Sequence, residues 1–349
     1  MNQEAVQRFA GQVLSDLAGA YGGVMVNLGH RLGLYQALAA AGPLTADELA
    51  ARTGTHARYV REWLHSQAAA GYVTLHVEGA RFELPAEHAP VLTDENSPVF
   101  MAPAFGAAAS MYLDEDKTAA IFRSGAGMAW GEHDHRLFHA VESFFRNGYR
   151  QNLSSVWIPK LDGIDAILRA GGRVADVGCG HGASTILMAQ AYPRSELVGF
   201  DSHAASIEIA KRRAAEAGVG ERVRFEVADA RSFRRGPYDL ICFMDSYHDL
   251  GDPHLAAAHA RSQLSSHGSL MLVEPYASAR VQENVGPIAR LYFSASTTMC
   301  TPNALSQGSV ALGAQAGPER LLGSLREGGF SHVRAVHEDA FNLVLEAKP

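Results

Sequence analysis

The segment that most constrains the fold is a glycine-rich stretch placed directly after an apolar run. Residues 173–177 (RVADV) are typical of a buried β-strand, and residues 178–184 (GCGHGAS) follow without a linker. A helix is expected next, over residues 185–191. Glycines at such a turn let a ligand lie against the backbone at the N-terminus of the helix. We therefore predict a ligand site here. Taken alone, the pattern also fits the dinucleotide fingerprint G-x-G-x-x-A.

Three further strand-like runs follow, and each ends in a carboxylate. They are residues 197–200 before Asp201, residues 223–228 before Asp229, and residues 238–244 before Asp245. This alternation of strands and helices after residue 160 predicts an α/β domain with a parallel sheet, whose strand ends share the edge where ligands bind. At that edge of the sheet, Asp201 can accept hydrogen bonds from both hydroxyls of a ribose. Asp229 and Ala230 could contact the polar edge of an adenine base.

In this order, the segments Val174–Gly182, Gly199–Asp201 and Ala228–Ala230 resemble the successive motifs of class I S-adenosylmethionine-dependent methyltransferases. The resemblance implies a seven-stranded Rossmann-like sheet whose last two strands, near residues 333–338 and 341–347, pair antiparallel. It implies S-adenosyl-L-methionine as cofactor and S-adenosyl-L-homocysteine as product. The cofactor contacts that it implies are Asp176, Gly178, Cys179, Gly180, Asp201, Ser202, Asp229, Ala230, Phe243, Met244 and Asp245.

A second motif, residues 247–253 (YHDLGDP), follows the fourth strand. With the N-terminal domain described below, it resembles the small-molecule O-methyltransferase group, closest to actinobacterial winged-helix members sometimes labelled transcriptional regulators. In that group the residue matching His248 is the general base, and a glutamate matching Glu274 orients it. The resemblance implies in-line methyl transfer to a small aromatic or hydroxylated acceptor, typically in secondary metabolism. Two alternatives stay open: His248 could cap the next helix, and Glu274 could bond only to backbone.

The first hundred residues are predicted to form helices followed by a hairpin. Apolar residues recur at helical spacing from Glu4 to about Leu38, with an interruption expected at Gly22-Gly23. A capping box, Thr45 with Glu48, should begin a short helix, and Thr55 can cap the next one. Two alternating runs, residues 71–77 and 81–84, then complete a winged helix-turn-helix.

Charge argues against DNA as the partner of this winged helix. Residues 1–100 hold 6 Arg and no Lys against 10 acidic residues, a balance of −4, and the whole chain carries −7. Most non-specific affinity for DNA comes from basic side chains that neutralise phosphates, and this domain has few such side chains. We therefore expect dimerisation through the apolar N-terminal helix and covering of the active site. A cofactor-binding transcriptional regulator is the alternative.

The expected domains are residues 1–100 (winged-helix dimerisation domain), 101–155 (connecting helices that cover the active site) and 156–349 (S-adenosylmethionine-binding methyltransferase domain). An acceptor pocket should be apolar and aromatic, drawn from the connecting region and the insertion after the fifth strand. Its candidate residues, each of which could equally be core, are Trp130, His139, Phe144, Tyr149, Tyr292, Phe293, Met299 and Cys300.

Sixteen histidines raise the question of a metal. His135 and His139 would share a helix face next to His133 and could ligate one, or the segment could be a solvated N-terminal turn. Because no second ligand cluster stands elsewhere in the sequence, we predict no metal ligands. Three Cys do not make a disulfide framework, and neither a membrane span nor a signal-peptide pattern is visible, so a cytoplasmic protein is expected.

Overall fold

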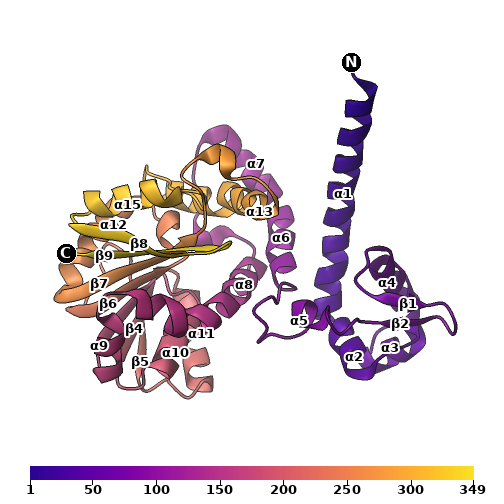
Figure 1. Ribbon diagram of the computed structural model, residues 1–349, viewed down its shortest axis with the longest axis horizontal. Coiled ribbons are helices and arrows are strands. Elements are labelled where there is room, and N and C mark those ends of the chain that lie inside the picture. The colour runs from indigo at the N-terminus through magenta and orange to yellow at the C-terminus, as the bar shows by residue number, and fades with distance from the viewer. The chain divides into compact units, whose positions relative to one another are not determined.

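The computed structural model describes residues 1–349, which divide into two compact units (Figure 1). Unit 1 comprises Met1–Tyr112 and His139–Asn147, and unit 2 comprises Leu113–Phe138 and Gly148–Pro349. Helix α8 (Arg136–Asn152) contributes residues to both units. None of the helices combines the length and the apolar composition that crossing a membrane requires.

Unit 1 is a helical domain with a two-stranded wing. Its elements are α1 (Gln3–Arg31), α2 (Leu34–Ala41), α3 (Ala46–Thr53), α4 (Ala57–Ala69), β1 (Thr74–His76), β2 (Arg81–Glu83), α5 (Ala89–Leu92) and α6 (Ala104–Leu113). The capping box that begins α3 is confirmed: the Glu48 N–H donates to Thr45 Oγ1, and the Thr45 N–H donates to Glu48 Oε2. The core of the domain packs around Tyr35 and Leu64, and the Trp63 indole N–H donates to the carbonyl of Met25.

Two details of the N-terminal prediction are wrong. Helix α1 runs without a break through Gly22 and Gly23, and the chain turns at Gly33 instead, where φ is 69°. Helical glycines cost only about 1 kcal/mol each, which a long helix tolerates, whereas a left-handed turn needs a residue such as glycine. The cap of α4 is His56, whose Nδ1 accepts from the Arg58 N–H, because the Thr55 hydroxyl pairs with that of Thr53.

Unit 2 is built on a seven-stranded mixed sheet, as predicted, and its strand order is β5-β4-β3-β6-β7-β9-β8. Its strands are β3 (Arg173–Val177), β4 (Glu196–Asp201), β5 (Val223–Val227), β6 (Tyr238–Met244), β7 (Leu264–Pro275), β8 (His332–Glu338) and β9 (Asn342–Lys348). The first five pair in parallel, and β9 lies antiparallel between β7 and β8. The carboxyl ends of β3, β6 and β7 therefore meet at one edge.

Helices cover both faces of this sheet. Figure 1 shows α12 (Pro253–Gln263) and α15 (Gly317–Glu327) on one face, and α9 (Ile164–Ala170), α10 (Ala183–Ala191) and α11 (Ala204–Glu216) on the other. The remaining helical segments are α7 (Glu115–Ser124), η1 (Trp130–Glu132), η2 (Leu153–Trp157), η3 (Ile158–Lys160), η4 (Tyr247–Asp249), η5 (Val281–Glu283), α13 (Pro287–Ala295), η6 (Ser296–Cys300) and α14 (Thr301–Gln307).

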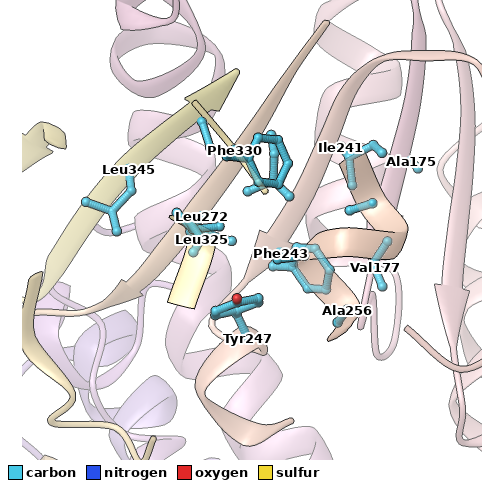
Figure 2. Close-up of a cluster of buried hydrophobic side chains, with 14 of the residues drawn as sticks. Ala175, Val177, Ile241, Phe243, Tyr247, Ala256, Leu272, Leu325, Phe330 and Leu345 are labelled. Atoms are coloured by element: carbon cyan, nitrogen blue, oxygen red, sulfur yellow. The ribbon is translucent and has the colours of Figure 1, made fainter. Parts of the chain in front are cut away.

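The core under α12 and α15 fixes the central strands. Figure 2 shows alternate residues of β3 and β6, among them Val177 and Phe243, in one cluster with Ala256 of α12 and Leu325 of α15. Alternation is expected because successive side chains of a strand point to opposite faces. Tyr247 belongs to the same cluster, so the turn that carries His248 is anchored in the core.

Candidate active site

The glycine-rich turn between β3 and α10 has the backbone geometry that only glycines adopt readily. Gly178, Gly180 and Gly182 have φ of 76°, 52° and 81°, in the left-handed region. A Cβ on Gly178 would lie 2.7 Å from the side chain of Ser246, and one on Gly182 would lie 2.8 Å from Phe225. The turn thus needs glycine at these two positions for space as well as for φ, and it keeps the backbone open to a ligand at the start of α10.

Asp176 is a buried carboxylate with one satisfied oxygen. Its Oδ2 accepts hydrogen bonds from the hydroxyls of Ser184 and Thr185, both at 2.6 Å, while Oδ1 has no hydrogen-bond partner in the protein. Burial raises the pKa of Asp176 to about 6 against the lowering effect of these hydroxyls. An unsatisfied buried oxygen of this kind suits a ligand ammonium, and S-adenosylmethionine carries one.

Asp201 stands at the end of β4 and is held by two backbone amides. Oδ2 accepts from the Gly180 N–H and Oδ1 from the His203 N–H, both at 2.8 Å. Burial raises the pKa of Asp201, although both amides lower it. Because each carboxylate oxygen has a second lone pair, Asp201 can still accept from ribose hydroxyls.

Asp229 differs, because its carboxylate is already engaged. Arg231 donates to it through the backbone N–H and through the guanidinium, at 2.8–3.2 Å, and these bonds lower the pKa of Asp229 despite its partial burial. Ala230 and Ser202, the neighbours of Asp229 and Asp201 in the predicted set, lie in the loops that follow β5 and β4. The adenine contact of Asp229 stays a prediction.

The end of β6 carries a second buried carboxylate. Asp245 has φ of 51°, unusual for a residue other than glycine, and its Oδ2 accepts from the Tyr149 hydroxyl at 2.7 Å. Its Oδ1 has no hydrogen-bond partner, and burial raises the pKa of Asp245 to about 8. Phe243 and Met244, which precede it in β6, are buried.

His248 and Glu274 form the pair that the resemblance implies. They are 3% and 1% exposed, and Nδ1 of His248 lies 2.5 Å from Oε2 of Glu274. Oε1 of Glu274 accepts from the Tyr247 N–H at 3.0 Å, so this carboxylate holds both the backbone and the ring of the turn. With the Nδ1–H donated to Glu274, the lone pair of the neutral imidazole is on Nε2, as a general base requires.

A second carboxylate faces the other nitrogen of this ring. Oδ1 of Asp249 lies 3.1 Å from Nε2 of His248. Burial by itself lowers the pKa of His248, but the charges of Asp249 and Glu274 raise it well above its ordinary value. Both carboxylates therefore favour the protonated form of the imidazole.

The predicted acceptor residues lie in both units. His139 and Phe144 belong to unit 1, where His139 is exposed and Phe144 half-buried; the others belong to unit 2. Tyr149 bonds Asp245, and Asp245 and His248 both act electrostatically on the buried Tyr292. The rest of the unit 2 set is Trp130 (half-buried, in η1), Phe293 (39% exposed, in α13), and Met299 and Cys300 (buried, in η6).

The structure also shows functional contacts that the sequence did not indicate. The hydroxyls on Asp176 come from the first turn of α10, and nothing in the residue pattern singles them out. His133 is buried against Asp114, whereas His135 is exposed, so the predicted histidine group does not act as a unit. Cys179, the remaining predicted cofactor contact, is buried in the glycine turn, and all three cysteines are free.

Comparison with known proteins identifies both domains. Residues 20–94 match the family model described as an Rv2258c-like winged HTH domain, and residues 168–311 match the model described as a methyltransferase domain. The chain carries a winged helix followed by a methyltransferase domain. The second match includes the glycine turn, Asp201, His248 and Glu274.

Individual relatives agree with this methyltransferase assignment. The 27-O-demethylrifamycin SV methyltransferase of Amycolatopsis mediterranei is 35% identical over 107 residues, 30% of this chain and 39% of that protein. The first curated relatives are matched over only 24%, 39% and 23% of their own length. An O-methyltransferase family protein from Burkholderia thailandensis superposes with a TM-score of 0.70 at 18% identity, covering 100% of this chain and 98% of that one.

Human N-acetylserotonin methyltransferase, solved in complex with S-adenosylmethionine, gives a TM-score of 0.68 at 19% identity over 97% of both chains. At such identities the structural likeness shows the fold, which is that of S-adenosylmethionine-dependent methyltransferases. The glycine turn and the unsatisfied oxygen of Asp176 fit that cofactor.

The glycine turn makes a direct prediction. Gly178→Ala should lower the free energy of unfolding by about 2–5 kcal/mol, the sum of a left-handed φ and a clash with Ser246. Gly180→Ala is the matched control, since its φ is similar but no atom lies within 4 Å of the added Cβ, and it should cost about 1–2 kcal/mol. Chemical denaturation measures both; equal losses would show that the clash with Ser246 contributes nothing.

Proposed function

We propose that this protein transfers the methyl group of S-adenosyl-L-methionine to an oxygen of a small aromatic or hydroxylated molecule. The observation that carries the proposal is the position of His248, oriented by Glu274, at the same sheet edge as the glycine turn and Asp176. By their names, the matched relatives act on 27-O-demethylrifamycin SV and N-acetylserotonin, both small molecules. These names support an acceptor of that class, and the first of them supports a place in secondary metabolism.

The cofactor would be held by residues of the first three strand ends. Asp176 would bind its ammonium group through Oδ1, Asp201 would bind the ribose hydroxyls, and Asp229 with Ala230 would lie at the adenine. The remaining predicted contacts, Gly178, Cys179, Gly180, Ser202, Phe243, Met244 and Asp245, would line the same edge. When bound, S-adenosylmethionine supplies a methyl carbon made electrophilic by its sulfonium.

His248 would provide the base. Its Nε2 would take the proton of the acceptor hydroxyl, which would free an oxygen lone pair to receive the methyl group that the cofactor supplies. Glu274 fixes the tautomer and stabilises the imidazolium that results. The other task of the protein is to hold the acceptor in line with the methyl, which can contribute about 7–11 kcal/mol.

The winged helix would serve dimerisation. Helix α1 exposes a stripe of large apolar side chains: Val6, Phe9, Val13, Leu17, Val24 and Leu28. Their spacing of three, four and seven residues puts them on one helical face. We propose that the same face of a second copy covers this stripe, making a homodimer through the N-terminal domain.

DNA binding, the alternative function, is favoured only by the winged-helix family match. The arginines of α4 are neutralised within the protein: Arg58 pairs with Glu62, and Arg61 lies 3.7 Å from Asp47. Little positive charge is left for phosphates. A DNA regulator would bind a promoter fragment with a steep salt dependence and methylate no acceptor.

The base role of His248 has a simple test. With labelled cofactor and a panel of phenols, His248→Ala should lower kcat by about 10²–10⁴-fold, the usual contribution of a general base. His267→Ala, at an exposed position of β7, should leave kcat unchanged. Turnover that survives His248→Ala would remove the base assignment, and the absence of any methylated phenol or alcohol would remove the proposed function.

The two carboxylates around His248 predict the pH profile. Because they raise its pKa, kcat/KM should rise with pH above 6.5, the ordinary pKa of histidine. Asp249→Asn removes one of these charges, so the rising limb should move to lower pH. Asp252→Asn changes a carboxylate that contacts Arg231 and the Ser309 N–H, and its profile should match the wild type, measured in metal-free buffer.

Dimerisation predicts a change of mass. Val13→Glu with Leu17→Glu places charge in the apolar stripe and should convert a dimer to a monomer in light scattering coupled to size exclusion, since burying unpaired charge is costly. The control adds the same charge beside the stripe, with Gln12→Glu and Ser15→Glu, which are exposed polar positions. A monomeric wild type would contradict the proposal.

A further inference from the structure

Three side chains with metal-binding atoms meet beside the end of β6. His248 and Asp249 come from η4 and Cys300 from η6, and their ligand atoms lie within 4.8 Å of one another. His248 and Cys300 are 3% and 7% exposed. This group, the His248–Asp249–Cys300 cluster, joins residues about fifty positions apart in the sequence.

Asp249 faces both other members of this cluster. Its buried Oδ1 lies 3.1 Å from Nε2 of His248, and its carboxylate acts on both His248 and Cys300 through charge and side-chain hydrogen bonding. A buried carboxylate is costly unless hydrogen bonds or positive charge compensate it, and a cation would supply that charge. The distance of 3.1 Å is close to the separation of about 3.3 Å between two donor atoms that are each 2.0–2.1 Å from a tetrahedral ion.

His133 is a further candidate donor near this cluster. Its Nε2 is buried and has no hydrogen-bond partner, and the Asp249 charge acts on its ring. The side chain of Asn303 links the segment of His133 to Asp249: Oδ1 of Asn303 accepts from the Trp130 N–H at 2.9 Å, and its Nδ2 donates to the Asp249 carbonyl at 3.1 Å.

Each of these two histidines has a carboxylate beside one ring nitrogen, as metal-bound histidines normally do. Nδ1 of His248 lies 2.5 Å from Glu274, and Nδ1 of His133 lies 3.4 Å from Asp114. A carboxylate on one ring nitrogen fixes the tautomer, orients the ring and makes the other nitrogen a better ligand. In both cases the other nitrogen is Nε2, which in His248 lies 3.1 Å from Oδ1 of Asp249 and in His133 has no hydrogen-bond partner.

Cys300 is placed by a local change in helix geometry. Its π-helical turn η6 lies between α13 and α14, so an extra residue is inserted into a helical run over residues 287–307. Such an insertion rotates the side chains that follow it and frees backbone groups, and π-turns of this kind are frequent at functional sites.

We propose that His248, Asp249, Cys300 and His133 bind a divalent transition-metal ion of the zinc type. The donor set of two imidazoles, one thiolate and one carboxylate suits zinc or cobalt, whereas magnesium and calcium prefer oxygen alone. The ligand atoms of His248, Asp249 and Cys300, now within 4.8 Å of one another, need to approach by about 1 Å to reach tetrahedral spacing, and His133 would complete the set.

The site goes beyond the proposed function and does not depend on it. An ion on Nε2 of His248 takes the lone pair that would otherwise accept the proton of the acceptor.

The test uses the full-length protein without a histidine tag, treated with a chelator and titrated with Co²⁺ alone. We expect stoichiometric binding with the visible bands of tetrahedral cobalt and a near-ultraviolet thiolate-to-cobalt charge-transfer band. Cys300→Ser should abolish the charge-transfer band, and Cys242→Ala, a buried cysteine of β6, should leave it intact. Asp114→Asn removes the charge beside Nδ1 of His133 and should weaken Co²⁺ binding about 10–100-fold, whereas Lys117→Met, which removes the other charged partner of Asp114, should not.

Retained binding of S-adenosylhomocysteine shows that each variant is folded. Absence of Co²⁺ binding, or a charge-transfer band that persists in Cys300→Ser, would overturn the site. Failure of the proposed function looks different, because Co²⁺ would then bind as expected while no acceptor is methylated in either the metal-free or the loaded protein.

Discussion

The burial of carboxylates at one edge of a parallel sheet is the constraint on which the rest of this site depends. β3 pairs with β6, and β6 with β7, all in parallel, so Asp176, Asp245 and Glu274 reach the same edge. Removing an ionised carboxylate from water costs several kcal/mol unless hydrogen bonds or positive charge compensate. The raised pKa values of Asp176 and Asp245, about 6 and about 8, express that cost.

The protein itself supplies hydrogen-bond donors to these three carboxylates unevenly. Glu274 has an imidazole and a backbone amide, whereas Asp176 and Asp245 have hydroxyl donors on one oxygen and no hydrogen bond on the other. A ligand that brings positive charge would therefore be stabilised here. An ammonium and a sulfonium on one molecule meet that requirement, which is why the electrostatics of the edge support the proposed cofactor independently of the family match.

The parts of the fold that could be predicted are those fixed by local pattern. The seven strands, the glycine turn and the capping box of α3 depend on residues close together in sequence, and each is as expected. The break expected at Gly22-Gly23 was wrong because helix propensity is a weak force that neighbouring turns override.

Contacts between distant segments could not be predicted. Sequence proximity suggested that His133, His135 and His139 act together, but the structure buries His133 against Asp114 and leaves His135 exposed. Cys300 was predicted only as an acceptor-pocket residue, because no periodicity reveals that a π-turn brings it to His248. Which side chains contact one another depends on the packing of the whole unit. The strand-end carboxylates are the exception, because parallel pairing of the strands is enough to bring them to the same edge.

His248 shows how the same carboxylates can serve two chemistries. Glu274 on Nδ1 favours any positive species on Nε2, whether a proton or a metal ion, because its charge stabilises both. The charge of Asp249 strengthens the preference for a proton on Nε2. In the proposed metal site Asp249 would strengthen the preference for an ion as well, because it would also be a ligand. A ring flanked on both sides is thus a poor base until Asp249 is compensated by another group. The neighbour that distinguishes the two chemistries is Cys300: burial raises the pKa of its thiol, so it is no proton acceptor, but in the proposed metal site it would become a strong ligand once an ion drew off its proton.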